Sequence, residues 1–296
     1  MVSNNYEPPN NYKMKHLLTL LLIAISTSGI FAQEKLNFDK RYVQSEDQWV
    51  AFPADTLGSY PFGFIYIDSE AGLTFNYESS FTIDSNGKFI PEEKVPTRIM
   101  KYRLDPKQNV LVAFIPESKF SELQIKKIPD WLSIYKEGEN SVEQLYKKGY
   151  RYNAWGECEK ALEFLEKAKK TDVEYKGLRV ELAYSYNCLE RYSDAIEILK
   201  KAVKYAPLDA YTNKELIYAY AKSGNIKEAK NICRKMVRDC PDKTFNAEIA
   251  FNILQAYFMK KDIANFNDWL AESGSYLLND KNLKGYVEAM KEELKK

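Results

Sequence analysis

The chain has 296 residues, of which 43 are Lys or Arg and 42 are Asp or Glu, so its formal net charge is +1. This balance indicates neither nucleic-acid binding nor adsorption to an anionic membrane, and a content of 45% hydrophobic and 29% charged residues is typical of a folded chain. The single histidine is His16. If processing removes it, no imidazole remains for a catalytic triad, a zinc site or acid–base catalysis.

Residues 1–32 are predicted to be an N-terminal extension followed by a signal peptide. The basic segment Lys13–His16 precedes a nine-residue apolar run, Leu17–Ile25, and Ala32 supplies a small residue at the cleavage point. The run is shorter than the about 20 residues of a membrane-spanning helix, which favours cleavage over a retained anchor. We therefore expect translation to start at Met14, cleavage after Ala32, and a periplasmic or secreted product.

Residues 33–129 are predicted to form a small antiparallel β sandwich or barrel. Short runs rich in β-branched and aromatic residues alternate with turn residues. The candidate strands are 49–52, 62–67, 73–77, 80–83, 88–90, 97–104 and 110–115. Asp84–Gly87 predicts a hairpin, because Asn-Gly tolerates positive φ. A calcium loop is disfavoured, because its glycine stands at the sixth position and Gly87 is fourth.

The aromatic residues of this β segment admit two interpretations. Six alternate along the strands: Tyr60, Phe62, Phe64, Tyr66, Phe75 and Tyr77. They are more often core residues, but a stacking face for sugars would make the segment a carbohydrate- or cell-wall-binding module, with the helices as a spacer. A hydrolase that uses a carboxylate pair is a third alternative.

The second half of the chain, after a linker at 130–141, is periodic. Ala161, Ala195 and Ala229 are spaced by 34, and so are the tyrosines at 152, 186 and 220. This pattern resembles the tetratricopeptide repeat, a helix-turn-helix unit. The resemblance implies repeats at 142–175, 176–209 and 210–243, a degenerate fourth at 247–280, and a final capping helix at 281–296. The fold class is therefore α+β, a β domain followed by a helical solenoid.

The resemblance also implies a binding groove, because the first helix of each pair lines a concave surface in this family. The groove positions carry Tyr146, Tyr150, Asn153, Tyr184, Asn187, Lys214, Tyr218 and Lys222. Tyrosines supply contact area, and asparagine amides pair with an extended peptide backbone. The alternative is that the tyrosines only support neighbouring helices. A carboxylate clamp of the family's type is not expected, because two of the three fifth positions are Tyr146 and Val180 rather than Lys.

All four cysteines lie in the repeats. Cys158 begins a second helix and Cys188 ends the next first helix, so these two either form a disulfide in an exported protein or remain buried thiols. Cys233 and Cys240 stand about 10 Å apart along one helix, too far for a bridge.

No sequence motif points to catalysis. The chain has no CxxC, Walker, G-x-S-x-G or G-x-G-x-x-G motif, so we predict no catalytic residues, no metal and no cofactor. The predicted function is an exported, non-enzymatic scaffold or adaptor that binds a protein or peptide. We expect no nucleic-acid partner and no membrane insertion after cleavage, and the oligomeric state stays open.

Overall fold

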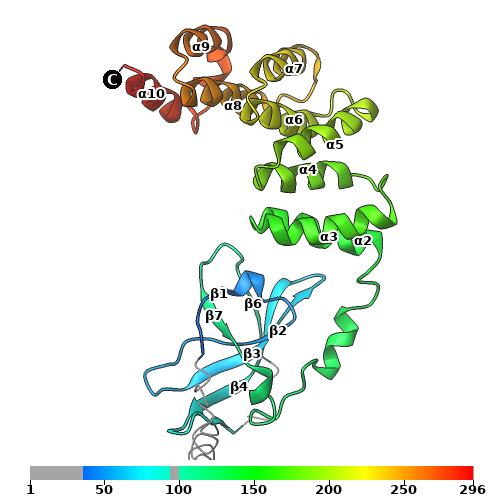
Figure 1. The fold of residues 1–296 in the computed structure, drawn as a ribbon, viewed down its shortest axis with the longest axis vertical. Coiled ribbons are helices and arrows are strands. Elements are labelled where there is room, and N and C mark those ends of the chain that lie inside the picture. The colour runs from blue at the N-terminus through cyan, green and yellow to red at the C-terminus, as the bar shows by residue number, and fades with distance from the viewer. Residues whose placement is uncertain (1–35, 94–99, 296) are drawn as a thin grey trace, which may run out of the picture. The chain divides into compact units, whose positions relative to one another are not determined.

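The computed structural model describes residues 36–93 and 100–295 (Figure 1). The chain divides into two compact units between Leu132 and Ser133. A seven-stranded antiparallel sheet lies in the first unit and helices make up the second, which confirms the α+β class. The predicted signal segment, with His16 and Ala32, lies outside the described residues.

The first unit is built on one antiparallel sheet. Its strands are β1 (Lys40–Arg41), β2 (Gln48–Ala51), β3 (Tyr60–Asp68), β4 (Gly72–Ile83), β5 (Phe89–Pro91), β6 (Met100–Arg103) and β7 (Leu111–Phe114). They lie in the order β1-β7-β2-β3-β4-β5, and β6 pairs with the first part of β4. The predicted strands at 73–77 and 80–83 are one strand of 12 residues. The sequence did not indicate β1, because two residues are too few to show an alternation.

The alternating aromatics of the first unit belong mostly to its core. Phe62, Phe64, Tyr66 and Phe75 are all buried. Trp131 packs edge-on against two of them, with ring centres 5.9 Å from Phe64 and 5.0 Å from Tyr66. The core interpretation is therefore confirmed for these four residues, and they present no sugar-stacking face.

The predicted hairpin at Asp84–Gly87 joins β4 to β5. The Asp84 carboxylate accepts the backbone N–H groups of Asn86 at 2.8 Å and Lys88 at 2.9 Å, and Gly87 has a φ of +78°. The hydrogen bond from the Lys88 N–H lowers the pKa of Asp84. The carboxylate thus holds the turn, as Asx turns do.

The second unit is a stack of helix pairs. The helices are α2 (Val142–Ala154), α3 (Cys158–Thr171), α4 (Leu178–Cys188), α5 (Tyr192–Tyr205), α6 (Ala210–Lys222), α7 (Ile226–Asp239), α8 (Asn246–Met259), α9 (Ile263–Leu277) and α10 (Lys284–Glu293) (Figure 1). The first helices contact one another in the order α2, α4, α6 and α8, and the second helices α3, α5 and α7 each pack between their own partner and the next first helix. No helix in the described ranges is long and apolar enough to cross a membrane.

Small residues let the helices of a pair approach closely. Ala161, Ala195 and Ala229, the alanines that mark the repeat period, are fully buried in α3, α5 and α7. On α2, a Cβ added to Gly149 would lie only 2.4 Å from the Cγ atom of Leu165. This packing explains why small residues recur at these positions.

Candidate functional site

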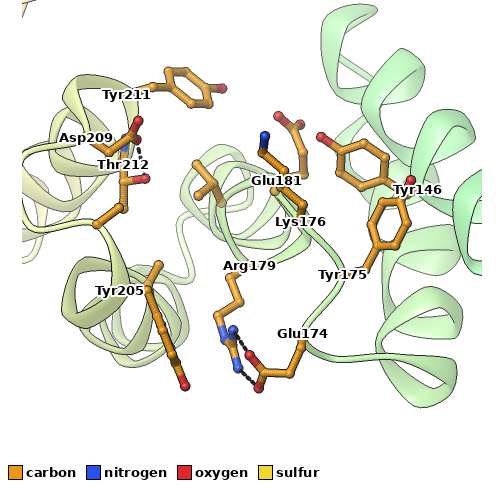
Figure 2. Close-up of a pocket in the computed structure, with 14 residues that line it drawn as sticks. Tyr146, Glu174, Tyr175, Lys176, Arg179, Glu181, Tyr205, Asp209, Tyr211 and Thr212 are labelled. Carbon is orange, nitrogen blue, oxygen red and sulfur yellow. Dashed lines mark hydrogen bonds and ion pairs between the residues drawn. The ribbon is translucent and has the colours of Figure 1, made fainter. Parts of the chain in front are cut away.

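A pocket of about 530 Å³ opens on the first three helix pairs (Figure 2). Its lining comes from α2, the α3–α4 connection, the start of α4, the end of α5 and the start of α6. Figure 2 shows Tyr146 and Tyr175 on one side, Tyr205 and Tyr211 on the other, and Glu181 between them. We call this the Glu181 pocket. Four tyrosines contribute to its walls, and the Glu181 carboxylate lies between them.

The connection before α4 shapes the Glu181 pocket. Gly177 has a φ of +85°, and a Cβ at this position would lie 2.7 Å from the hydroxyl oxygen of Tyr146. Any other residue would therefore strain the backbone and displace that tyrosine. The ring of Tyr146 also packs 5.2 Å from Tyr175 and 6.4 Å from Tyr150, centre to centre. These contacts hold one aromatic wall in place.

Glu181 is a largely buried carboxylate with one oxygen bonded and one open. The residue is 5% exposed. Its Oε2 atom accepts a hydrogen bond of 3.0 Å from the Asn153 amide, which also donates to the backbone oxygen of Glu181 at 3.0 Å. Within the described part of the chain, Oε1 accepts no hydrogen bond and forms no ion pair. Burial disfavours the charged form and raises the pKa of Glu181, despite the bond from Asn153.

Two tyrosines of the pocket, Tyr146 and Tyr211, are held in the protonated form at neutral pH. Burial, followed by the negative charge of Glu181, raises the pKa of Tyr146 to about 12. Burial and the carboxylates Glu181 and Glu215 likewise raise the pKa of Tyr211. A ligand therefore meets neutral phenol rings whose hydroxyls can donate or accept hydrogen bonds.

A second pocket, of about 340 Å³, lies on α4, α6 and α8 and has its own internal cation. It is lined by Tyr184, Asn187, Cys188, Lys214, Glu215, Tyr218 and Glu248. We call this the Lys214 pocket. The Lys214 ammonium lies 3.2 Å from Glu215 Oε1 and 3.5 Å from Glu248 Oε1. It also stands over the ring of Tyr211, 4.7 Å from its centre.

Seven of the eight predicted groove residues lie in or beside these two pockets. Tyr146 lines the first, and Tyr184, Asn187, Lys214 and Tyr218 line the second. The two others are neighbours of these: Tyr150, an exposed ring beside Tyr146, and Lys222, whose ammonium lies 5.6 Å from the ring centre of Tyr218. The structure thus brings the predicted tyrosines and lysines onto one surface.

The two predicted asparagines have a different role, which corrects the sequence interpretation. Asn153 and Asn187 are each 3% exposed. The Asn153 amide bonds Glu181, and the Asn187 amide bonds Glu215 at Oε2 (2.9 Å) and at the backbone oxygen (3.1 Å). These donors join successive first helices. The N–H groups that the sequence predicted to contact a peptide backbone therefore already form hydrogen bonds within the fold.

Sequence reasoning missed Glu181, Glu215 and Tyr211 as residues of this surface. The first two stand one period apart, each at the sixth position of its repeat. That recurrence was a usable signal, because acidic residues on a helix normally stay exposed. Tyr211 has no tyrosine one period earlier, since Gly177 stands there.

The structure joins Cys158 to Cys188 by a disulfide, which links the start of α3 to the end of α4 with Cα atoms 6.2 Å apart. Cys233 and Cys240 are buried free thiols. Burial raises the pKa of Cys233 to about 12, so this thiol is unreactive at neutral pH. Among the residues described, no group of His, Cys, Asp or Glu side chains could hold a metal ion.

Comparison with known proteins identifies the repeat. The family model of the tetratricopeptide repeat matches residues 189–256, which run from the end of α4 through most of α8. The predicted repeat is therefore confirmed, and the helical unit contains tetratricopeptide repeats. No curated protein matches the chain.

Proposed function

We propose that this tetratricopeptide-repeat protein is an exported, non-enzymatic scaffold that binds a protein or peptide along the first helices of its repeats. The observation that carries the proposal is the pair of pockets that follow one another along α4 and α6, both lined by tyrosines. Tyrosine supplies a large contact area with few rotatable bonds, and it is common at binding hot spots. Export is inferred from the signal-like segment at 1–32.

The form of the surface favours a peptide segment over a single small molecule. The volumes, about 530 and 340 Å³, fall within the about 300–1,000 Å³ of small-ligand sites, so the succession of two pockets, rather than their size, favours a peptide. The two pockets share the helices α4 and α6, so consecutive side chains of one extended segment can enter both. The repeat family supports a protein partner.

A carbohydrate-binding role for the β unit has less support. Four of the six aromatic residues considered for sugar stacking are buried in its core. The repeats, in contrast, carry pockets whose lining includes the predicted tyrosines.

Peptide selection on the full chain tests the proposal. A random peptide library is panned against the immobilised protein, and the affinity of the selected peptides is measured by fluorescence polarisation. We expect the combined change of Tyr150, Tyr184 and Tyr218 to Ala to weaken binding by about tenfold or more, as loss of hot-spot tyrosines does. Tyr286→Ala is the matched control, because this exposed tyrosine lies on α10 and lines neither pocket. Failure to select any peptide, or equal affinity of the triple variant, would contradict the proposal.

A further inference from the structure

We infer that the Glu181 pocket holds the cationic side chain of a lysine or arginine in the bound peptide, between the Glu181 carboxylate and the pocket tyrosines. The inference rests on the proposed function and adds the chemical class of ligand for one pocket.

The first observation is the open oxygen of Glu181. The Asn153 amide bonds Oε2 and fixes the carboxylate, whereas Oε1 accepts no hydrogen bond within the described residues. Glu181 lines the pocket, and its unbonded oxygen is not fully buried, so a ligand can reach it. A fixed and largely buried carboxylate binds a cation more strongly than an exposed one does.

The second observation is that the next repeat contains such a cation. Glu215 occupies the same repeat position as Glu181, and it accepts the Asn187 amide as Glu181 accepts that of Asn153. Its other oxygen, Oε1, lies 3.2 Å from the Lys214 ammonium. One period before Lys214 the chain has Val180, so Glu181 lacks the lysine that its counterpart has.

The aromatic surroundings of Lys214 show how the cation is accommodated. Its ammonium lies 4.7 Å from the ring centre of Tyr211 and 5.1 Å from that of Phe245, within the range of cation–π attraction. Tyr211 also lines the Glu181 pocket, together with Tyr146. Where the third repeat has Tyr211, the second has Gly177, and the hydroxyl of Tyr146 lies above that glycine. The room for a side chain from outside is the pocket itself, which Glu181 lines between Tyr146 and Tyr211.

Three other charged residues of the pocket, Glu174, Arg179 and Asp209, are engaged elsewhere. Arg179 and Glu174 form a bidentate pair, with one N–O distance of 2.7 Å. The Asp209 carboxylate caps α6 by accepting the N–H of Thr212 at 2.8 Å. Lys176 is exposed and also lines the pocket, and the described structure contains no ion pair between its ammonium and Glu181. Glu181 is therefore the carboxylate available to an incoming cation.

Parallel selection on the full chain and on Glu181→Gln tests this inference. Glutamine keeps an oxygen for the Asn153 amide and removes only the charge. We expect peptides selected on the unmodified chain to share a lysine or arginine at one position, and replacement of that residue by norleucine to weaken binding about tenfold or more. In Glu181→Gln the affinity should fall by a similar factor, and norleucine should then have no further effect. Glu163→Gln removes an exposed acid on α3, outside both pockets, and should bind like the unmodified chain.

The outcomes separate this inference from the proposed function. Selected peptides without a shared basic residue, or with equal affinity for the chain and Glu181→Gln, would overturn the cation site and leave the peptide-binding surface standing. A norleucine effect that persists undiminished in Glu181→Gln would place the cation elsewhere and also overturn it. If no peptide is selected on any form of the chain, both proposals fail.

Discussion

A buried asparagine without a full set of hydrogen bonds leads to a paired prediction about stability. The Asn153 side-chain oxygen accepts a hydrogen bond of 2.8 Å from the Ser185 hydroxyl. Among the described residues, the equivalent oxygen of Asn187 is buried without a hydrogen-bond partner, because one period after Ser185 the chain has Ala219. Ser185→Ala should therefore lower the free energy of unfolding by about 1–3 kcal/mol, the cost of an unsatisfied buried acceptor. Ala219→Ser should raise it by about 0.5–1.5 kcal/mol, the net contribution of a new hydrogen bond.

Urea denaturation followed by far-ultraviolet circular dichroism measures both changes. Ser185 and Ala219 occupy equivalent positions and are both fully buried. Because the fold accommodates the serine hydroxyl at the first position, we expect space for one at the second. The decisive control is Asn187→Ala, which removes the acceptor. In that background Ala219→Ser should no longer stabilise the protein. The reasoning is refuted if Ala219→Ser stabilises equally with and without Asn187, or if Ser185→Ala leaves the urea midpoint unchanged.

Three further predictions concern the charge, the disulfide and the close packing of the repeats. Burial raises the pKa of Glu181 above its ordinary 4.5, so its favourable contribution to stability is present below that pH and is lost as the pH rises through the raised value. Glu181→Gln should therefore be more stable than the unmodified chain at pH 7 and equally stable at pH 4. If the variant and the unmodified chain have the same urea midpoint at both pH values, the prediction is contradicted. Replacing Cys158 and Cys188 together by Ser opens a loop of 30 residues and should lower the free energy of unfolding by about 3–4 kcal/mol, according to the chain-entropy relation. Urea denaturation measures this change. The unmodified chain treated with reductant should lose the same amount of stability. Gly149→Ala places a methyl group 2.4 Å from a leucine of α3 and should destabilise by about 1–3 kcal/mol, whereas Gly285→Ala on α10 meets nothing within 4 Å and should raise the melting temperature slightly.

The helical unit was largely predictable because its packing repeats. Helix pairs that stack on one another place the same side chain in the same environment once in every repeat, so Ala161, Ala195 and Ala229 are buried for one shared reason. The predicted repeat starts at 142 and 210 coincide with the first residues of α2 and α6. A periodic pattern of this kind is visible without any structure.

The same period could not distinguish a groove position from a contact between repeats. Tyr150 and Asn153 lie one helical turn apart on α2, and both recur in the next repeat, at Tyr184 and Asn187. Tyr150 is exposed, whereas Asn153 is buried against α4. Periodicity reports that a position is repeated, but the side on which the next helix packs depends on how the pairs are rotated against each other.

The β unit shows a different limit of sequence reasoning. Alternating aromatic and β-branched residues predict most of its strands, but not their pairing order, because strand neighbours depend on contacts between distant segments. β7 lies between β1 and β2, so segments about 60 residues apart in sequence form adjacent strands. Composition and alternation contain no information about that order.

Glu181 and Glu215 show how one repeat position can contribute to the fold and to recognition. Each accepts an asparagine amide from the preceding repeat, a contact that a neutral glutamine would make as well. The negative charge is thus not needed for the contact, and burial opposes it, as the raised pKa of Glu181 indicates. At Glu215 the ammonium of Lys214 offsets the burial of the charge within the folded chain. Next to Glu181, the position equivalent to Lys214 is occupied by Val180. In the proposed binding mode the compensating cation therefore belongs to the partner, and its interaction with Glu181 stabilises the complex rather than the fold.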